Sequence, residues 1–318
     1  MGIPFDIPAL AIVGPTASGK SALGVWLAQQ GLPIEIISLD SALVFRDMDI
    51  GTAKPSPQEL ASVPHHLIDI ISPEETFSAA DFLTACHGLI ADIRQRGRVP
   101  VILGGTLMYY NAMVAGLDDL PKADAIIRAR IEADANQLGW PHVHAELSKV
   151  DPVTAARLKP NDSQRLQRAM EVYLLTGQPL STFHKRDQAQ RLSLPTLALE
   201  PGDRSVLHAR IAERFVHMLE SGLIDEVVSL RQRYVLDTAM PSMRCVGYRQ
   251  VWAYLDGELN RAEMIEKGVA ATRQLAKRQI TWLRSMPGKH TVDPLQANWL
   301  ELAKPWLSNT VDALLQFK

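Results

Sequence analysis

The stretch Gly14-Pro-Thr-Ala-Ser-Gly-Lys-Ser21 decides the fold of this chain. It matches the pattern G-x-x-x-x-G-K-[ST] and lies between an apolar run, residues 10–13, and a segment with apolar residues at helical spacing, residues 21–30. In that context the pattern predicts a phosphate-binding loop, because backbone N–H groups converge on phosphate oxygens at the positive end of the helix. Lys20 would supply a point charge and Ser21 a magnesium ligand. The predicted phosphate-binding residues are Gly14, Pro15, Thr16, Ala17, Ser18, Gly19, Lys20 and Ser21.

Two further apolar runs extend this unit into a sheet. Residues 34–39 end at Asp40-Ser41, and residues 99–103 end at Gly104-Gly105-Thr106. Between these runs, residues 79–96 have the pattern of a helix. Strands that alternate with helices predict a parallel sheet covered by helices. We therefore expect an α/β fold of the P-loop NTPase-like type, with a parallel sheet flanked by helices.

The middle of the chain has a different pattern. From about residue 117 to residue 191 the apolar residues recur at helical spacing, with breaks at Gly139-Trp-Pro, Lys159-Pro-Asn and Gly177-Gln-Pro. Residues 192–199 then have the character of a returning strand, and helices resume from Asp203 to about Arg284. The sequence predicts a core domain of residues 1–116 and 192–318, and a helical insertion domain of residues 117–191.

Composition excludes several protein classes. The chain has 318 residues, a formal net charge of −2 and no apolar run of membrane-spanning length. Its first residues have no signal-peptide pattern, so we expect a cytoplasmic protein. Cys86 and Cys245 are the only cysteines, which favours buried free thiols over a disulfide framework or a zinc site. No feature indicates a membrane or a protein partner, which is compatible with a monomer.

A phosphate cradle alone leaves the reaction open, because a bound polyphosphate can be transferred, hydrolysed or expelled. Asp40 follows a strand and could hold magnesium, as in a nucleotide kinase or an ATPase. The run at residues 101–103 has no acid at its end. By these features alone a small-molecule kinase is the default.

Longer strings connect the chain to one family. They are Asp40-Ser41 leading to Met48-Asp-Ile-Gly-Thr-Ala-Lys-Pro55, His65-His-Leu-Ile-Asp69, Gly104-Gly-Thr-Leu-Met-Tyr109, Pro160-Asn-Asp-Ser-Gln-Arg165 with Arg168, Arg244-Cys-Val-Gly-Tyr-Arg249 and Thr272-Arg-Gln-Leu-Ala-Lys-Arg-Gln-Ile-Thr-Trp-Leu-Arg284. In these strings and in their order the chain resembles the bacterial tRNA dimethylallyltransferases. Two positions depart from the family pattern: Phe45 stands where tyrosine is usual, and Asp47 where glycine is common.

The resemblance implies a prenyl transfer. A dimethylallyl group would leave dimethylallyl diphosphate and join N6 of adenosine 37 in the anticodon loop of tRNAs that read codons beginning with U, with release of pyrophosphate. Mg²⁺ is the implied cofactor, with Ser21 as its ligand, and the phosphate loop becomes a diphosphate site. The implied catalytic residues are Asp40, Thr16, Lys20, Thr106 and Arg128.

Two of these residues keep alternative roles. The adenine amino group is a weak nucleophile, so removal of its proton would help the reaction, and Asp40 is the candidate base. Asp40 could instead be a magnesium ligand. Thr106 either faces the diphosphate or caps the helix that follows it.

Basic residues recur in three of the matching strings and predict a tRNA surface. Arg165 and Arg168 are expected to face outward together, and Arg273, Lys277 and Arg284 form a stripe at helical spacing. Tyr248 and Trp282 could stack on bases or lie in the core. The residues expected to contact tRNA are Asp40, Ser41, Ala42, Leu43, Thr106, Arg128, Gln164, Arg165, Leu166, Gln167, Arg168, Arg244, Cys245, Val246, Gly247, Tyr248, Arg249, Lys277, Arg278, Gln279, Ile280, Thr281, Trp282, Leu283 and Arg284.

Two other functions remain as alternatives: an adenylate isopentenyltransferase that acts on free nucleotide, and a P-loop small-molecule kinase. The former would not need the basic strings, and the latter should use ATP productively. Lys54 is either a solvated charge or a phosphate contact, and His65 and His66 are expected to be structural.

Overall fold

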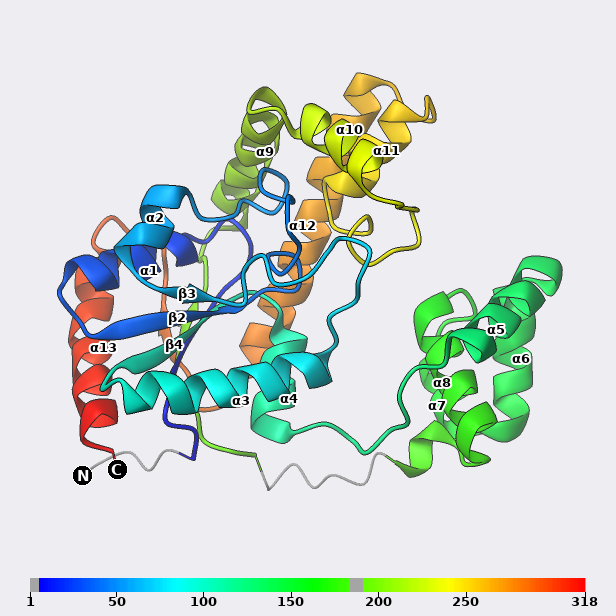
Figure 1. The fold of residues 1–318 in the computed structure, drawn as a ribbon, viewed down its shortest axis with the longest axis horizontal. Coiled ribbons are helices and arrows are strands. Elements are labelled where there is room, and N and C mark those ends of the chain that lie inside the picture. Colours follow the sequence, from blue (N-terminus) through cyan, green and yellow to red (C-terminus); the bar gives the residue numbers. More distant parts are fainter. Residues whose placement is uncertain (1–5, 184–190, 318) are drawn as a thin grey trace. The chain divides into compact units, whose positions relative to one another are not determined.

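The computed structural model describes residues 6–183 and 191–317. In this part of the chain six parallel strands form one sheet in the order β3-β2-β4-β1-β5-β6. Figure 1 labels three neighbouring strands of this sheet, β3, β2 and β4. The strands are β1 (Leu10–Val13), β2 (Ile34–Leu39), β3 (His65–His66), β4 (Val99–Gly104), β5 (Thr196–Leu199) and β6 (His290–Val292). The predicted parallel α/β class is confirmed.

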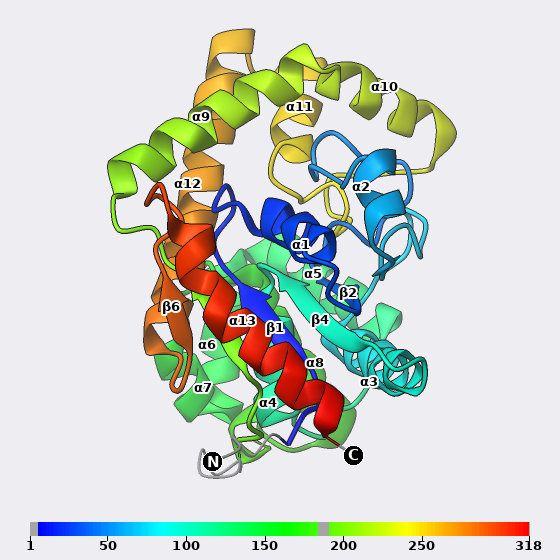
Figure 2. The same ribbon diagram turned by 90° about the vertical axis from the view of Figure 1, so that its left-hand side faces the viewer.

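Helices cover both faces of this sheet. On one face, α1 (Lys20–Gln29) and α13 (Trp299–Gln316) pack on side chains such as Leu10 and Ile12, and Figure 2 shows α13 crossing the strands on this side. On the other face, α3 (Ala79–Gln95) and α4 (Leu107–Ala115) pack on Ala11 and Val13. Successive residues of a strand point to opposite faces, so burial of both faces explains why these strands are continuous apolar runs.

A second core lies among the later helices of the same unit. It is built by α9 (Arg204–Glu220), α10 (Leu223–Arg233), α11 (Tyr248–Leu255) and α12 (Arg261–Ser285), which gather together in Figure 1. Helices α9 and α12 approach closely at Gly268, where an added Cβ would lie 2.1 Å from the Phe215 ring. Val44, Phe45 and Met48, in the loop after β2, belong to the same core. The chain segment next to Asp40 is therefore anchored on these helices. The short helix α2 (Pro57–Ser62) follows that segment and contacts α1.

The chain divides into two compact units, Met1–Val114 with Leu192–Lys318, and Ala115–Arg191. The second unit consists of α5 (Ala125–Leu138), α6 (Trp140–Val150), α7 (Pro152–Arg157), α8 (Ser163–Thr176) and the 3-10 turn η1 (Leu180–Thr182). Its core includes Ile131, Leu147 and Leu166. Two of the predicted breaks coincide with helix ends, since Gly139 and Gly177 follow α5 and α8 with positive φ angles of 85° and 68°.

Some elements differ from the expectation. Strand β5 begins at Thr196, after Pro195, because proline cannot donate to a strand ladder. The short edge strands β3 and β6 were not predicted. None of the helices in the described ranges has the length and apolar character that crossing a bilayer requires. Cys86 is buried and Cys245 is partly buried, and burial raises the pKa of both thiols to about 12.

Candidate active site

Three loops of the predicted site leave the same edge of the sheet. The phosphate loop follows β1, Asp40 follows β2, and Gly105-Thr106 follows β4. The backbone N–H groups of Gly105 and Thr106 donate to the Leu39 carbonyl at 3.1 and 3.0 Å, which ties the end of β4 to the residue before Asp40. The carboxyl ends of parallel strands are where ligands of such sheets bind. The structure therefore brings the phosphate loop, Asp40 and Thr106 to one candidate site.

The phosphate loop has the local geometry of an anion site. Gly19, directly before α1, has a left-handed φ of 87°, a conformation that glycine adopts without steric cost. Ala17 shares a left-handed φ of 61°. Lys20 Nζ donates to the Pro15 carbonyl at 2.7 Å, so the lysine folds back over its own loop. The hydroxyl of Ser18 is buried and has no hydrogen-bond partner within the described structure, which leaves a donor for a ligand oxygen.

Charge in the site is shared by three side chains. Burial lowers the pKa of Lys20 to about 8, the Asp40 carboxylate opposes this, and the Arg214 guanidinium adds to it. Burial also lowers the pKa of Arg214, again opposed by Asp40. Two cations and one carboxylate thus act on one another beside the phosphate loop. Such a set suits a ligand with several negative charges, which would relieve the repulsion between Lys20 and Arg214.

Arg214 was not predicted. It follows Leu207 by seven residues and Ile211 by three, so it belongs to the apolar stripe that buries α9. A charge on a buried stripe was the signal that could have found it.

Thr106 contacts the loop after β2 through its side chain. Its hydroxyl oxygen accepts from the Ser41 N–H at 3.0 Å and lies 3.3 Å from the Ser41 hydroxyl. Asp40 Oδ1 accepts from the Ala42 N–H at 2.8 Å. The Thr106 side chain therefore holds the loop that starts at Asp40, and Asp40 Oδ1 holds the same loop through the Ala42 N–H.

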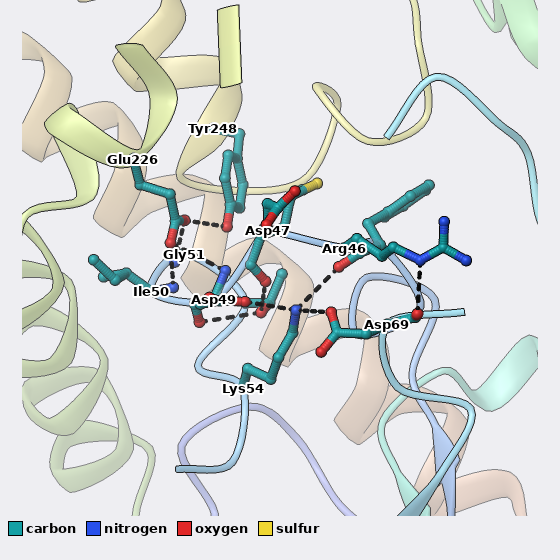
Figure 3. Close-up of polar contacts among 12 residues, drawn as sticks. Arg46, Asp47, Asp49, Ile50, Gly51, Lys54, Asp69, Glu226 and Tyr248 are labelled. Atoms are coloured by element: carbon teal, nitrogen blue, oxygen red, sulfur yellow. Dashed lines mark hydrogen bonds and ion pairs between the residues drawn. The ribbon is translucent and has the colours of Figure 1, made fainter. Parts of the chain in front are cut away.

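The loop after Asp40 is held by a polar cluster that Figure 3 shows. Lys54, whose side chain is only 6% exposed, donates to the Phe45 carbonyl at 3.0 Å and pairs with Asp49 at 2.6 Å and with Asp69. Its two expected roles were a solvated charge and a phosphate contact, and neither role fits this buried and paired environment. Lys54 is a structural cation of the loop.

The two departures from the family pattern lie in this loop. Phe45 is buried in the core among α9–α12. Asp47 has a left-handed φ of 62°, which explains why glycine is suitable there, and aspartate is among the residues that tolerate this region. Its carboxylate accepts from Arg233 at 2.8 Å and from the Tyr234 hydroxyl. Asp47 thus adds an attachment to α10 that glycine could not make.

Glu226 and Tyr248 complete the same anchor. The Glu226 carboxylate accepts from the consecutive N–H groups of Asp49, Ile50 and Gly51 at 2.7 to 3.2 Å. The Tyr248 hydroxyl donates to Glu226 at 2.5 Å (Figure 3). An added Cβ at Gly51 would lie 2.4 Å from the Tyr248 ring, so this contact requires glycine. Of its two expected roles, the fully buried Tyr248 has the core role in this structure.

The strings expected to contact tRNA in this unit divide between surface and core. The buried members are Gly247, Tyr248, Ile280 and Leu283, and the partly buried ones Ala42, Leu43, Cys245, Val246 and Gln279. Trp282 is 44% exposed and lies beside the exposed Thr281 and Arg284 on α12. The remaining exposed members are Ser41, Arg244, Arg249, Lys277 and Arg278, and Arg273 of the predicted stripe is exposed as well. The exposed members are mostly cationic and include one aromatic ring.

Gln279 is directed at the candidate site. Its Oε1 accepts from the Thr16 N–H at 2.8 Å, and its Nε2 donates to the Gly105 carbonyl at 3.0 Å. One side chain of α12 therefore joins the phosphate loop to the loop after β4.

In the second unit, the arginines converge on a carboxylate that sequence reasoning missed. Arg128 donates to Glu171 at 2.8 and 3.2 Å, and Arg168 donates to it at 2.6 Å. Arg168 also donates to the Pro121 carbonyl, so it does not face outward together with Arg165. Arg165 is 74% exposed and pairs with Asp162. Gln164 is exposed, Gln167 donates to Glu132, and Leu166 is buried.

The two histidines have structural partners. His66 Nε2 lies 2.7 Å from the buried Glu35 carboxylate, and His65 Nδ1 lies 2.8 Å from the Val63 carbonyl. Hydrogen bonds from Arg96 and His66 lower the pKa of Glu35 to about 2. Both histidines are occupied at the sheet edge in β3.

A magnesium ion would find few protein ligands here. Within the described ranges no group of three or more histidine, cysteine, aspartate or glutamate side chains could enclose a metal. Ser21 is exposed at the start of α1, where its hydroxyl is accessible to a metal held by phosphate oxygens. Magnesium in phosphate sites characteristically keeps waters and takes one or two protein ligands besides the phosphates. The residues present fit that mode of binding.

Comparison with known proteins points to one family. A curated tRNA dimethylallyltransferase from Ralstonia nicotianae is 55% identical over 97% of this chain and 98% of that protein. The crystal structure of a tRNA isopentenylpyrophosphate transferase from Bacillus halodurans aligns with a TM-score of 0.68 and 38% identity, covering 96% of this chain and 97% of that one. A eukaryotic dimethylallyltransferase acting on tRNA aligns with a TM-score of 0.75 and 27% identity, covering 95% of this chain and 79% of that one.

A family model described as IPP transferase matches residues 43–286, from the loop after Asp40 through the end of α12. Together with the 55% identity to a full-length relative, this match shows that the chain belongs to the IPP transferase family of tRNA prenyltransferases.

Proposed function

We propose that the chain transfers a dimethylallyl group from dimethylallyl diphosphate to N6 of adenosine 37 in the anticodon loop of tRNAs that read codons beginning with U, giving N6-dimethylallyladenosine and pyrophosphate. The observation that carries this proposal is the convergence of Lys20, Arg214 and Asp40 at one edge of the sheet. Two cations beside a phosphate loop suit an anionic leaving group, and a carboxylate beside them suits removal of a proton. We also propose that the enzyme acts in the cytoplasm.

The chemistry needs one bond to break as another forms. The bond between the allylic carbon and the diphosphate oxygen breaks, the electron pair leaves with pyrophosphate, and N6 of the adenine bonds to the carbon. Negative charge grows on the leaving group, and the phosphate-loop N–H groups, Lys20 and Arg214 stabilise it. Asp40 takes the proton that N6 loses. We propose two further hydroxyl groups for the site: that of Thr16 in the phosphate loop, and that of Thr106, which contacts Ser41 in the loop starting at Asp40.

Magnesium is the cofactor that we propose, with Ser21 as its protein ligand. When bound, the ion neutralises charge on the pyrophosphate oxygens. Asp40 remains a candidate for either role, base or metal ligand, and the two assignments predict different responses to added metal.

The exposed residues of the basic strings would bind the tRNA. The exposed Lys277, Arg278 and Arg284 on α12 would contact phosphates, and the exposed Trp282 would offer a ring on which a base can stack. In the second unit, the exposed Arg165 and the partly exposed Arg128 and Arg168 would contribute further contacts. A base that reacts must leave its stack, so we propose that the target adenosine is extruded toward Asp40.

One assay tests the proposal against its alternatives. The protein is incubated with Mg²⁺, radiolabelled dimethylallyl diphosphate and either unmodified tRNA or AMP, and the labelled product is digested to nucleosides. We expect label in tRNA and none in AMP. Label in AMP alone would indicate an adenylate isopentenyltransferase, and phosphoryl transfer from added ATP without prenylation would indicate a kinase. The names of the matched relatives do not favour either alternative.

A further inference from the structure

Gln279 was expected to contact tRNA, but both ends of its carboxamide are already occupied. The Oε1 atom accepts from the backbone of Thr16, and the Nε2 atom donates to the backbone of Gly105. Its neighbours in sequence, Lys277 and Arg278, are exposed, whereas Gln279 is partly buried on the inner side of α12. A glutamine that read a base would need a free carboxamide.

The two backbone groups belong to opposite ends of the proposed reaction. Thr16 lies in the loop that would hold the leaving group. Gly105 precedes Thr106, whose hydroxyl holds the loop starting at Asp40. The Gly105 N–H donates to the carbonyl of Leu39, the residue before Asp40. The carboxamide therefore spans from the leaving-group side to the side of the candidate base.

The fit around this carboxamide is tight. An added Cβ at Gly105 would lie 2.5 Å from Gln279 Nε2 and 3.3 Å from the Gly14 carbonyl. Because Gly105 has no φ in the left-handed region, the absence of a side chain there serves the approach of Gln279 and not a special backbone conformation. The hydrogen bond from Gln279 to the Gly105 carbonyl thus depends on glycine at position 105.

We infer that Gln279 is a positioning residue, which fixes the phosphate loop relative to the loop that holds Asp40 and so sets the distance between leaving group and base. This inference rests on the proposed function and assigns Gln279 to the diphosphate site instead of the tRNA surface. Gln279 contacts no reacting atom itself. Its effect arises because small displacements between reacting groups reduce rates strongly, by up to about 10²-fold for 1 Å.

The test compares Gln279→Met with Gln274→Met. Methionine has a similar length but makes neither hydrogen bond, and Gln274 is an exposed glutamine on the same helix. We expect the Gln279→Met variant to lower the single-turnover transfer rate by about 10- to 10²-fold, to bind inorganic pyrophosphate more weakly, and to bind tRNA as the Gln274→Met variant does. Loss of tRNA affinity with an unchanged rate at saturating substrates would overturn the inference, as would no effect in any measurement.

A second variant covers the case in which Gln279→Met does not fold. Gly105→Ala keeps the glutamine but displaces its carboxamide, so it should reproduce the loss of rate and of pyrophosphate affinity. In a Gln279→Ala background the same Gly105→Ala change should cost much less, because the atom it collides with is gone. Equal effects in both backgrounds would overturn the inference. If the wild type binds pyrophosphate but prenylates no tRNA, the proposed function fails, while the pyrophosphate measurements still decide the role of Gln279.

Discussion

Arg128 donates a hydrogen bond of 2.8 Å to Glu171, a carboxylate whose side chain is completely buried in the helical unit. Arg168 donates to the second oxygen of the same carboxylate, and the Asp124 N–H donates to the first. Burial alone would raise the pKa of Glu171, but these hydrogen bonds hold it below its ordinary value. Glu171 therefore fixes two arginines that we propose for the tRNA surface.

Replacing this carboxylate should loosen the helical unit. We expect Glu171→Ala to cost about 2 to 3 kcal/mol, at the low end for a broken buried ion pair, because both arginines are partly exposed and can bind water instead. Hydrogen exchange of the α5 and α8 amides measures this locally. Arg165→Ala is the control, since its ion pair with Asp162 is exposed and should be worth less than about 1 kcal/mol. Equal protection in both variants would contradict the structural role of Glu171.

The hydrogen bonds to Glu171 should also make the stability of the helical unit depend on pH. A carboxyl group with a lowered pKa in the folded state contributes stability above its unfolded pKa, which is about 4.3 for glutamate, and loses that contribution as the pH falls through the folded pKa. The difference in stability between wild type and Glu171→Ala should therefore be full at pH 7 and shrink below about pH 4. A difference that stays constant down to pH 3 would count against the ion pairs.

How far the sequence predicted this molecule depends on the type of signal. The strand ends at Asp40 and Gly104 were predictable because apolar runs stop there, and the parallel sheet followed from their alternation with helices. The strands β3 and β6, two and three residues long, are too short to show any periodicity. The local sequence pattern thus predicts long helices and strands but not the short strands at the edges of the sheet.

The candidate site shows the same limit. The phosphate loop is a contiguous segment, so a local sequence pattern contains all of its residues. Glu171 and Arg128 are 43 residues apart, and Gln279 and Thr16 are 263 apart, so no local pattern could pair them. Arg214 and Gln279 did carry a signal, because each is a polar residue on an otherwise apolar helix face. That signal indicates a buried polar role, but its partners emerge only from the fold.

Salt should weaken tRNA binding steeply, because basic side chains displace counterions from phosphates. Lys277→Ala and Arg284→Ala should each flatten the slope of log affinity against log salt by about one unit. Lys267 is exposed on the first half of α12, so Lys267→Ala is the matched control and should leave the slope unchanged. Filter binding of unmodified tRNA at several salt concentrations measures all three. Slopes that are the same for all variants would mean that tRNA binds elsewhere.

Lys20 should give the reaction a high-pH limit. Its pKa of about 8 means that the free enzyme has a charged Lys20 below pH 8 and a neutral one above. If the charge holds the diphosphate, kcat/KM for dimethylallyl diphosphate should be level below pH 8 and fall about tenfold per pH unit well above it. In Lys20→Ala the value should be low throughout and lack this fall, with tRNA binding unaffected. An identical decline in both proteins would assign the titration to another group.

The change Asp40→Asn distinguishes the two roles left open for this carboxylate. Asparagine keeps the size of the side chain and an oxygen that can accept from the Ala42 N–H, but it cannot take a proton from N6. If Asp40 is the general base, single-turnover transfer at saturating tRNA should fall by about 10²- to 10⁴-fold, with the affinity for both substrates changed little. If Asp40 is a magnesium ligand, diphosphate binding should weaken, and raising the Mg²⁺ concentration should restore part of the rate. Rescue by metal would refute the role as base, and turnover near that of the wild type would remove Asp40 from the mechanism, leaving Lys20 and Arg214 as the groups that drive departure of the pyrophosphate.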